Sequence, residues 1–293
     1  PGDGVDLRAM RDRLLDAGST WAKVVVTAPD LADAGEVLDL VASSDPKSEP
    51  TIGFAMGDRA WPSRVLSCLL GGPMAYGAVG GGERATAPGQ LTVGELCGIY
   101  DVRRFGTATR VFGLVGNPAR HSLGPWLHNR AFRRLGLDAL YLPFETSRPR
   151  EVLAMLPRRR LGGLSVTAPF KSALVPHCHE LAESAIATGV VNTVTFPAHG
   201  QVIGHNTDVV GVQIALLDAG LPNRSNTERG ADGPAGAILG TGGAARAAAI
   251  ALQQLGYSVT FLGRSLDSVR EFARERSMGL ARLDAGVLRG LRP

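Results

Sequence analysis

The feature that most constrains the fold is a repeated alternation of short apolar segments with amphipathic helical patterns. In the first third of the chain, strand-like segments alternate with segments whose apolar residues recur every three or four positions. The strand-like segments cover residues 22–28, 51–56 and 74–79, and the helix-like segments cover 5–17, 31–42, 63–70 and 92–100. This alternation predicts a parallel sheet covered by helices, with too few units to close an eight-stranded barrel.

The same alternation restarts after a turn near residues 106–109. It predicts strands at 110–115, 139–144, 164–166, 190–196, 201–204, 237–240 and 258–262, and helices at 126–135, 149–156, 180–187, 209–219 and 244–255. The polar stretch 221–234 interrupts the pattern and is interpreted as a connection between domains. We therefore predict three α/β domains, at residues 1–106, 107–220 and 221–293.

Charge and cysteine content exclude several classes of protein. The chain has 31 Lys+Arg against 27 Asp+Glu, and its net charge of +4 is too mild to indicate a nucleic-acid partner. No apolar run reaches the roughly 18–20 residues that a membrane span needs. Three cysteines without metal-ligand spacing are typical of a reducing compartment. We expect a cytoplasmic protein with no metal site, and any organellar targeting segment upstream would lie outside this sequence.

A glycine-rich turn is the strongest single motif. Gly240, Gly242 and Gly243, followed by Ala244 and Ala245, stand between an apolar strand and an Ala-rich helix. This spacing allows a tight turn, close approach of a pyrophosphate to the backbone, and close packing of the helix. After the next predicted strand come Arg264 and Ser265. NAD-selective sites place a carboxylate at this position, whereas an arginine and a hydroxyl suit the 2′-phosphate of NADP.

The lysines are also informative, because only three of the 31 basic residues are lysines: Lys23, Lys47 and Lys171. A lysine amine can be titrated whereas an arginine stays charged, so each is a candidate for chemistry. Lys171 follows a predicted strand, and Asp208 lies downstream; such a pair suits proton transfer to or from a substrate hydroxyl. Lys47 lies in a polar loop and is interpreted as solvated.

Six ordered motifs carry a resemblance to a known family: Gly116-Asn117-Pro118, His121-Ser122, Leu127-His128-Asn129, Val166-Thr167-Ala168-Pro169-Phe170-Lys171, Val191-Asn192-Thr193 and Asn206-Thr207-Asp208. Over about residues 110–275 the chain resembles shikimate dehydrogenase. The resemblance implies that Lys171 and Asp208 form the catalytic pair, and that Ser122, Thr167 and Asn192 hold the hydroxyls or carboxylate of shikimate. Two positions depart from the family pattern: Gly124 replaces a serine, and Ser165 replaces an asparagine.

Lys23 lies within the apolar strand pattern of residues 22–28, and we expect it to be buried. Burial lowers the pKa of a lysine amine, which favours attack on a carbonyl and formation of a Schiff base. The alternative is a lysine whose amine reaches solvent from the end of a strand. The motifs that follow Lys23 favour the Schiff-base interpretation over this alternative.

Those motifs are Phe54-Ala55-Met56-Gly57, Ser63-Arg64, Ala75-Tyr76-Gly77-Ala78 and Thr86-Ala87-Pro88-Gly89-Gln90-Leu91. Over about residues 15–100 they resemble the C-terminal part of type I 3-dehydroquinate dehydratase, a (β/α)8 barrel. The resemblance implies that Lys23 forms the imine and that Arg64 binds the substrate carboxylate. By the same resemblance, Thr86 and Gln90 complete the pocket.

The order of the two segments resembles the fused enzyme of the shikimate pathway. The predicted architecture is the C-terminal part of a (β/α)8 barrel, then an α/β substrate domain, then a partial Rossmann domain that binds NADP. No histidine precedes His121, so the family's base is absent from the first segment. We therefore expect little activity from this segment of chain alone and two activities from a longer protein. The expected partners are the small molecules 3-dehydroquinate, 3-dehydroshikimate and shikimate.

Two alternatives remain at this point. One is a quinate/shikimate dehydrogenase that uses NAD, against which Arg264 argues. The other is a catalytically silent remnant or binding protein that keeps the fold, which the Gly124 departure favours and the presence of Lys23, Lys171 and Asp208 opposes.

Overall fold

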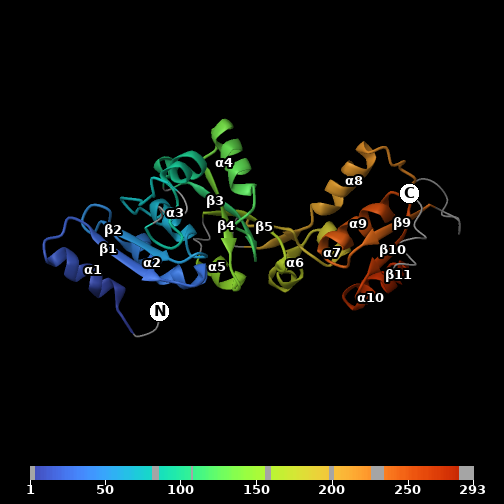
Figure 1. Ribbon diagram of the computed structural model, residues 1–293, viewed down its shortest axis with the longest axis horizontal. Helices are drawn as coiled ribbons and strands as arrows, with labels where there is room; N and C mark the ends of the chain where they lie inside the picture. The colour runs from blue at the N-terminus through green and yellow to red at the C-terminus, as the bar shows by residue number, and fades with distance from the viewer. Residues whose placement is uncertain are drawn as a thin grey trace. The chain divides into compact units, whose positions relative to one another are not determined.

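The computed structural model describes residues 4–80, 86–106, 108–155, 160–197, 201–225 and 234–283. The chain divides into two compact units, which are described separately. The first contains residues 1–170 and 195–200, and the second contains residues 171–194 and 201–293. Each described unit combines parallel strands with helices, so the predicted α/β class is confirmed (Figure 1).

The first unit begins with two parallel strands, β1 (Ala22–Thr27) and β2 (Thr51–Met56). Ala22 and Val24 point to the buried side of β1, because alternate residues of a strand face opposite sides. The helical elements of this region are α1 (Leu7–Asp16), η1 (Leu31–Ala34), α2 (Gly35–Ser43), α3 (Pro62–Leu69), the π-helical turn η3 (Glu95–Tyr100) and η4 (Val102–Arg104).

The strand predicted at residues 74–79 is wrong. Only Ala78 pairs with another segment, through a single bridge to Thr92 in which Ala78 N donates to Leu91 O and Val93 N donates to Ala78 O. Gly77 explains why the pairing stays local. A Cβ at Gly77 would lie 2.9 Å from the side chain of Val93 and 2.9 Å from that of Leu96, so the backbone packs directly onto the following helical turn.

The same unit continues with three parallel strands in the order β4-β3-β5. They are β3 (Arg110–Gly116), β4 (Ala139–Glu145) and β5 (Leu161–Val166), and they come with helices α4 (Gly124–Arg134) and α5 (Pro149–Met155). Buried side chains from before and after residue 106 share one hydrophobic core, for example Leu31, Val37 and Leu66 with Leu140 and Phe144. The two parts of this unit are therefore packed as one body.

The second unit holds the region that follows β5 and the glycine-rich turn. Its first part begins with α6 (Phe170–Ala173), which starts at the last residue of the first unit. It continues with η5 (Val175–His177), β6 (Glu180–Leu181), α7 (Glu183–Thr188), β7 (Thr193–Thr195), whose last residue belongs to the first unit, β8 (Ile203–His205) and α8 (Asp208–Asp218). β6 pairs in parallel with β8. The helix predicted from residue 180 thus starts three residues later, after a short strand.

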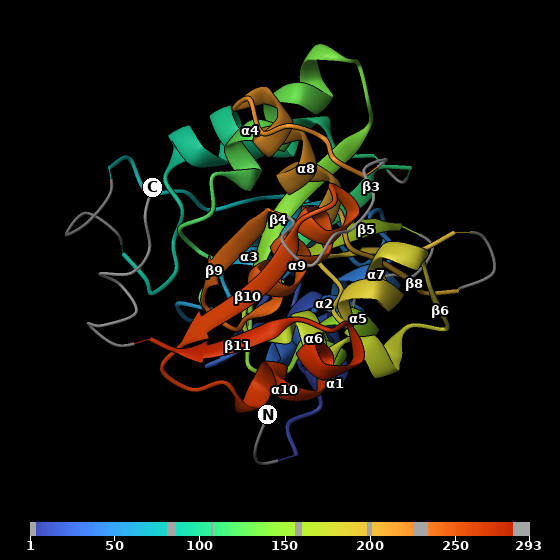
Figure 2. The same ribbon diagram turned by 90° about the vertical axis from the view of Figure 1, so that its right-hand side faces the viewer.

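The second part of this unit is a parallel sheet in the order β11-β10-β9, seen side by side in Figure 2. Its elements are β9 (Ala235–Leu239), α9 (Gly243–Gln254), β10 (Ser258–Gly263), α10 (Asp267–Glu275) and β11 (Gly279–Arg282). This strand order is that of one half of a doubly wound dinucleotide fold. Among the described residues, no helix is both long and apolar enough to cross a membrane.

Candidate active sites

The second unit brings Lys171 and Asp208 into direct contact. Lys171 lies in the short helix α6, and Asp208 is the first residue of α8. The Lys171 Nζ donates to Asp208 Oδ2 at 2.5 Å. The lysine side chain is 21% exposed and the aspartate side chain 31%, so the pair is accessible to a small molecule.

Asn192 holds the other oxygen of this aspartate. Its Nδ2 donates to Asp208 Oδ1 at 2.7 Å and to Thr207 Oγ1 at 2.9 Å, while its Oδ1 accepts from Thr207 N at 2.9 Å. The backbone fixes the same arrangement, because Val191 N donates to Lys171 O at 2.8 Å. Three motifs that lie far apart in the sequence therefore converge on one carboxylate.

Asn206 is a residue to which the sequence analysis gave no role. It is 1% exposed, and its Oδ1 accepts from Asp208 N at 3.0 Å. Its Nδ2 donates to Thr188 Oγ1 at 3.0 Å and to Val190 O at 3.2 Å. Asn206 thus fixes the start of α8. The available signals were its place in the motif Asn206-Thr207-Asp208 and its position three residues before the predicted helix 209–219.

The glycine-rich turn lies beside Lys171. A Cβ on Gly243, the first residue of α9, would lie 3.1 Å from the Cδ atom of Lys171. Gly240 has φ +119°, a conformation that favours glycine, and a Cβ at Gly240 or Gly242 would meet no atom within 4 Å. The turn is therefore open on the side of Gly240 and Gly242 and closed by Lys171 at Gly243.

The chemistry of this turn fits a dinucleotide. No side chain caps α9, which begins at Gly243 and continues through Ala244 and Ala245, so its first N–H groups are available to phosphate oxygens. Arg264 and Ser265 follow β10 and are exposed. Ser265 Oγ is 3.5 Å from Asp267 Oδ2. The predicted cofactor residues are thus gathered in one unit with Lys171 and Asp208.

Ser122 and Thr167 belong to the first unit, beyond the ends of β3 and β5. Thr167 N donates to Val115 O at 3.0 Å, and Ser122 Oγ accepts from Gly124 N at 3.0 Å. A Cβ at Gly124 would lie 2.9 Å from Tyr141 Cε1, so the Tyr141 ring occupies the space next to this glycine.

The second departure from the family pattern lies against the same ring. The Tyr141 hydroxyl donates to Ser165 Oγ at 3.1 Å. Tyr141 thus contacts both positions at which the sequence departs from the family pattern.

Lys23 is exposed, and the prediction that it is buried is wrong. It alternates with Ala22 and Val24, which face the helices, so its own side chain points to the opposite face of β1. Its Nζ lies 4.1 Å from the centroid of the Tyr76 ring. The apolar composition of this strand therefore did not indicate on which face the lysine lies.

Arg64 has the burial expected of an anion-binding group. It is 5% exposed, its guanidinium carbon lies 4.4 Å from the centroid of the Phe54 ring, and burial lowers the pKa of the guanidinium. Its Nη2 donates to Pro88 O at 3.3 Å, whereas its buried Nε has no hydrogen-bond partner among the described residues. Such an unpaired buried donor is costly unless a ligand or water accepts from it.

The loop that carries Pro88 also holds Thr86 and Gln90. The N–H and hydroxyl of Thr86 donate to Gln90 Oε1 at 2.8 and 2.9 Å. The structure thus links Arg64 to the loop of Thr86 and Gln90 through Pro88 O. The Phe54 and Tyr76 rings, 6.3 Å apart, lie between the surroundings of Arg64 and those of Lys23.

Comparisons with known proteins find similarity to one family in each of two regions of the chain. Residues 3–106 match the family model of type I 3-dehydroquinase, and residues 114–194 match that of the shikimate dehydrogenase substrate binding domain. The two matched regions follow one another along the chain. Residues 3–106 are called the dehydroquinase segment below, and the chain from residue 110 onward is called the dehydrogenase segment.

Relatives show the same order of segments. The chain is 29% identical over 289 residues to the chloroplastic bifunctional 3-dehydroquinate dehydratase/shikimate dehydrogenase of Arabidopsis thaliana. This match covers 95% of the chain and 47% of the relative, so the chain spans about half the length of that protein.

Solved shikimate dehydrogenases match the dehydrogenase segment. The enzyme of Listeria monocytogenes, in complex with shikimate and NAD, has a TM-score of 0.51 and 30% identity, with 61% of this chain and 62% of that chain covered. A shikimate dehydrogenase in complex with NADP+ has a TM-score of 0.50 and 28% identity, with 61% and 63% covered.

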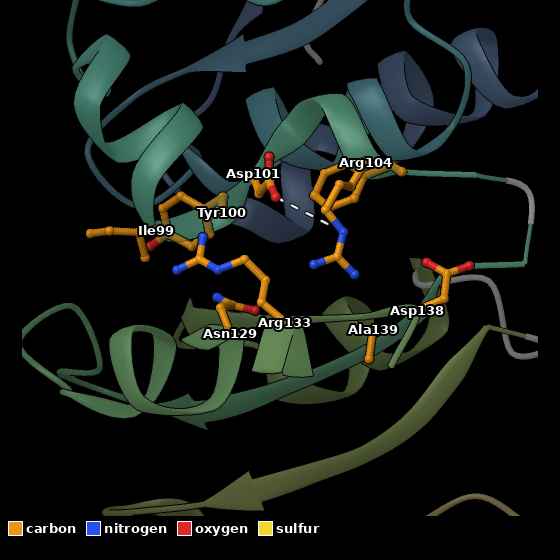
Figure 3. Close-up of a pocket in the computed structure, with 9 residues that line it drawn as sticks. Ile99, Tyr100, Asp101, Arg104, Asn129, Arg133, Asp138 and Ala139 are labelled. Atoms are coloured by element: carbon orange, nitrogen blue, oxygen red, sulfur yellow. Dashed lines mark ion pairs between the residues drawn. The ribbon is translucent and has the colours of Figure 1, made fainter. Parts of the chain in front are cut away.

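A small hollow lies between the end of the dehydroquinase segment and the start of the dehydrogenase segment (Figure 3). Arg104 and Arg133 extend into it from opposite sides, and Arg133 Nη1 donates to Gly98 O at 2.6 Å. Arg104 donates to Leu137 O at 3.2 Å. None of the predicted site residues lines this hollow, so it is part of the contact between the two segments and not a candidate active site.

Proposed function

We propose that the whole protein is an enzyme of the shikimate pathway whose dehydrogenase segment interconverts 3-dehydroshikimate and shikimate with NADP(H). The observation that carries this proposal is the Lys171–Asp208 pair, held by Asn192 and adjacent to the open glycine-rich turn. NADP(H), when bound, supplies or accepts the hydride. The chain's own task is to orient the substrate and to move a proton at the hydroxyl that becomes, or derives from, the carbonyl.

Lys171 and Asp208 perform the proton transfer in this proposal. On reduction, a proton passes from the Lys171–Asp208 pair to the carbonyl oxygen as the hydride reaches the carbon; on oxidation, the pair takes the proton from the hydroxyl. Ser122 and Thr167 donate hydrogen bonds to the hydroxyls or carboxylate of the substrate. Asn192 is the third substrate residue of this assignment, and both of its side-chain N–H groups are engaged by Thr207 and Asp208 in this structure. Asn192 also keeps Asp208 oriented through its bond to Oδ1.

NADP is the proposed cofactor, held by the turn from Gly240 to Ala245. Its 2′-phosphate would bind Arg264 and Ser265, since an arginine and a hydroxyl suit a phosphate. Solved relatives have been crystallised both with NADP+ and with NAD. In the alternative, an NAD-dependent quinate/shikimate dehydrogenase, Arg264 and Ser265 would bind no 2′-phosphate.

We further propose that the dehydroquinase segment is the C-terminal part of a (β/α)8 barrel in which Lys23 lies on the inner face. The Lys23 amine would condense with the carbonyl of 3-dehydroquinate and release water, and elimination of a hydroxyl as water followed by hydrolysis of the imine would release 3-dehydroshikimate. The Arg64 Nε, unpaired among the described residues, suits the substrate carboxylate, and Thr86 and Gln90 complete the pocket. Residues 3–106 contain no histidine, so the base must come from elsewhere in the whole protein.

The test uses the whole protein and both reactions. Shikimate is supplied with NADP+ or NAD+ and reduced cofactor is followed by absorbance; we expect turnover with a preference for NADP+. Borohydride reduction in the presence of 3-dehydroquinate is expected to label Lys23, with Lys47 as the matched lysine that stays unlabelled. Turnover that prefers NAD+ would favour the alternative, and a protein that binds shikimate without turnover would be the silent remnant. A cytoplasmic location stays a prediction.

A further inference from the structure

Glu145 fixes the loop that carries Ser122. It is the last residue of β4 and is 7% exposed. Its Oε2 accepts hydrogen bonds from the backbone N–H groups of Ala119 and Arg120, both at 2.9 Å. Ser122 N in turn donates to Ala119 O at 3.2 Å. One carboxylate therefore determines the position of the backbone immediately before Ser122.

The other oxygen of Glu145 faces two arginines, one from each segment. Arg120 Nε lies 3.4 Å from Oε1, and Arg59 Nε, from the dehydroquinase segment, lies 3.6 Å from the same atom. Burial disfavours ionisation of Glu145, but the two N–H groups and Arg120 outweigh this effect and lower the pKa of the carboxyl. Glu145 is therefore ionised near neutral pH and attracts both guanidinium groups.

The loop after β2 makes two further contacts with the dehydrogenase segment. Arg59 Nη2 donates to Asn117 Oδ1 at 3.5 Å, and Arg120 Nη2 donates to Asp58 O at 3.3 Å. Asn117 and Arg120 lie at the two ends of the stretch 117–120. Asp58 and Arg59 thus contact both ends of the backbone segment that leads to Ser122.

This loop of the dehydroquinase segment is itself constrained. Gly57 has φ +145°, and a Cβ there would collide with Ala28 O. Gly89, from the loop of Thr86 and Gln90, packs against Gly57 O so closely that it has no room for a side chain. The backbone at Gly57, two residues before Arg59, is therefore packed between the end of β1 and the loop of Thr86 and Gln90.

We propose that Arg59 is a positioning residue for the dehydrogenase: acting on Glu145 and Asn117, it holds the loop 117–122 so that Ser122 meets shikimate. This proposal rests on the proposed function of the dehydrogenase segment. Without Arg59 the loop would have to be ordered by the substrate, and the cost would appear in substrate affinity and not in the chemical step. A residue of one catalytic segment would thus set the substrate affinity of the other.

The test compares arginine variants of the whole protein in shikimate oxidation. For Arg59→Ala, the loss of one partly exposed ion pair and one hydrogen bond is expected to raise KM for shikimate by about 3- to 10-fold. The value of kcat is expected to stay within about twofold and KM for NADP+ to stay unchanged, because neither depends on this loop. Arg59→Lys keeps the charge and is expected to restore part of the affinity.

Two control variants separate positioning from a general loosening of the interface. Arg148→Ala removes an ion pair between the same two segments, from Arg148 to Asp33, but far along the chain from the loop 117–122. Arg8→Ala changes an exposed arginine of α1. We expect both to keep the wild-type KM. A double-mutant cycle of Arg59→Ala with Glu145→Gln is expected to be non-additive, since both act through one carboxylate.

An unchanged KM in Arg59→Ala, or an equal rise in Arg148→Ala, would overturn the proposal. Calorimetric titration of shikimate onto each variant gives the same comparison without turnover, so a wild-type protein that binds shikimate but does not oxidise it still tests Arg59. A wild-type protein that neither binds nor oxidises shikimate would overturn the proposed function itself, and this inference with it.

Discussion

The two lysines proposed for catalysis have very different surroundings. Lys171 is ion-paired to Asp208, and Asn192 and Asn206 fix that aspartate from two sides. Lys23 is exposed on one face of β1, and its amine lies over the ring of Tyr76. The partners of Lys171 all lie within one compact unit, between residues 171 and 208.

The surroundings of Lys171 and Lys23 differ in how many of the groups needed for each proposed reaction lie in this chain. A proton-transfer pair needs two groups in hydrogen-bond contact, and the chain from 171 to 208 contains both. An imine-forming lysine needs a pocket that excludes water and a separate base, and the dehydroquinase segment contains no histidine to provide one. The groups proposed for proton transfer are thus all in contact in this chain, whereas for the proposed Lys23 site the dehydroquinase segment lacks the base.

The largest expected effect is that of Lys171→Ala on turnover. Loss of the proton-transferring amine is expected to lower kcat for shikimate oxidation by about 10²- to 10⁴-fold. Steady-state kinetics measure kcat, and calorimetry is expected to show that shikimate still binds. Lys47→Ala is the matched control, and near-normal turnover in Lys171→Ala would contradict the assignment of the pair.

A smaller effect is expected from Arg264→Ala, which tests the cofactor side of the Lys171 site. Loss of one guanidinium–phosphate contact is expected to raise KM for NADP+ by about tenfold. KM for NAD+ is expected to stay the same, because NAD lacks the 2′-phosphate. Equal KM values for NADP+ in the variant and the wild type would remove the case for Arg264 as a phosphate ligand.

Asp30→Asn tests how firmly the Lys23 region is attached to the dehydrogenase segment. Asp30 Oδ1 accepts from Thr146 Oγ1 at 2.6 Å, and its Oδ2 accepts from Ser147 N at 2.9 Å. Burial opposes ionisation of Asp30, but these bonds outweigh it and lower the pKa of the carboxyl. We expect the free energy of unfolding at pH 7 to fall by about 1–3 kcal/mol.

The stabilising effect of Asp30 is expected to depend on pH. The pKa of Asp30 is lower in the folded state, so its stabilising contribution is present above the unfolded-state pKa and is lost as the pH falls through the folded-state pKa. Urea unfolding of wild type and Asp30→Asn should therefore differ at neutral pH and converge in acid. A difference that stays constant with pH would mean that the charge of Asp30 is not involved.

The smallest effect is expected from Lys23→Ala, which sharpens the contrast between the two lysines. An exposed lysine over one ring contributes less than about 1 kcal/mol to the free energy of unfolding. Its neighbour Val24 is 2% exposed, and Val24→Ala is expected to cost about 1–3 kcal/mol. Denaturant unfolding of both variants measures the difference. A loss for Lys23→Ala as large as that for Val24→Ala would show that this lysine is buried after all.

The sequence predicted the α/β class and most of the strands, because apolar periodicity reports burial directly. It failed at residues 74–79, where an apolar run packs onto a helical turn through Gly77. It also failed for the burial of Lys23, because a short apolar strand does not show which face a polar residue occupies. The motifs named Lys171, Asp208 and Asn192, and the structure brings these three together.

Glu145, Asn206 and Arg59 could not be predicted from the sequence. Each acts through contacts with residues distant in the sequence or with backbone N–H groups, and neither kind of contact leaves a spacing pattern. For Asn206, its place in the motif Asn206-Thr207-Asp208 and just before a predicted helix offered a signal, but not its contacts with Thr188 and Val190.

The hydrophobic core that spans residue 106 has a practical consequence for protein engineering. A dehydrogenase that starts after residue 106 would lack Leu31, Val37 and Leu66, which share a core with Leu140 and Phe144. The apolar surface around Leu140 and Phe144 would then be exposed to water. Such a product would tend to aggregate during expression. A usable stand-alone enzyme would need either polar replacements on that face or a substitute helix grafted over it.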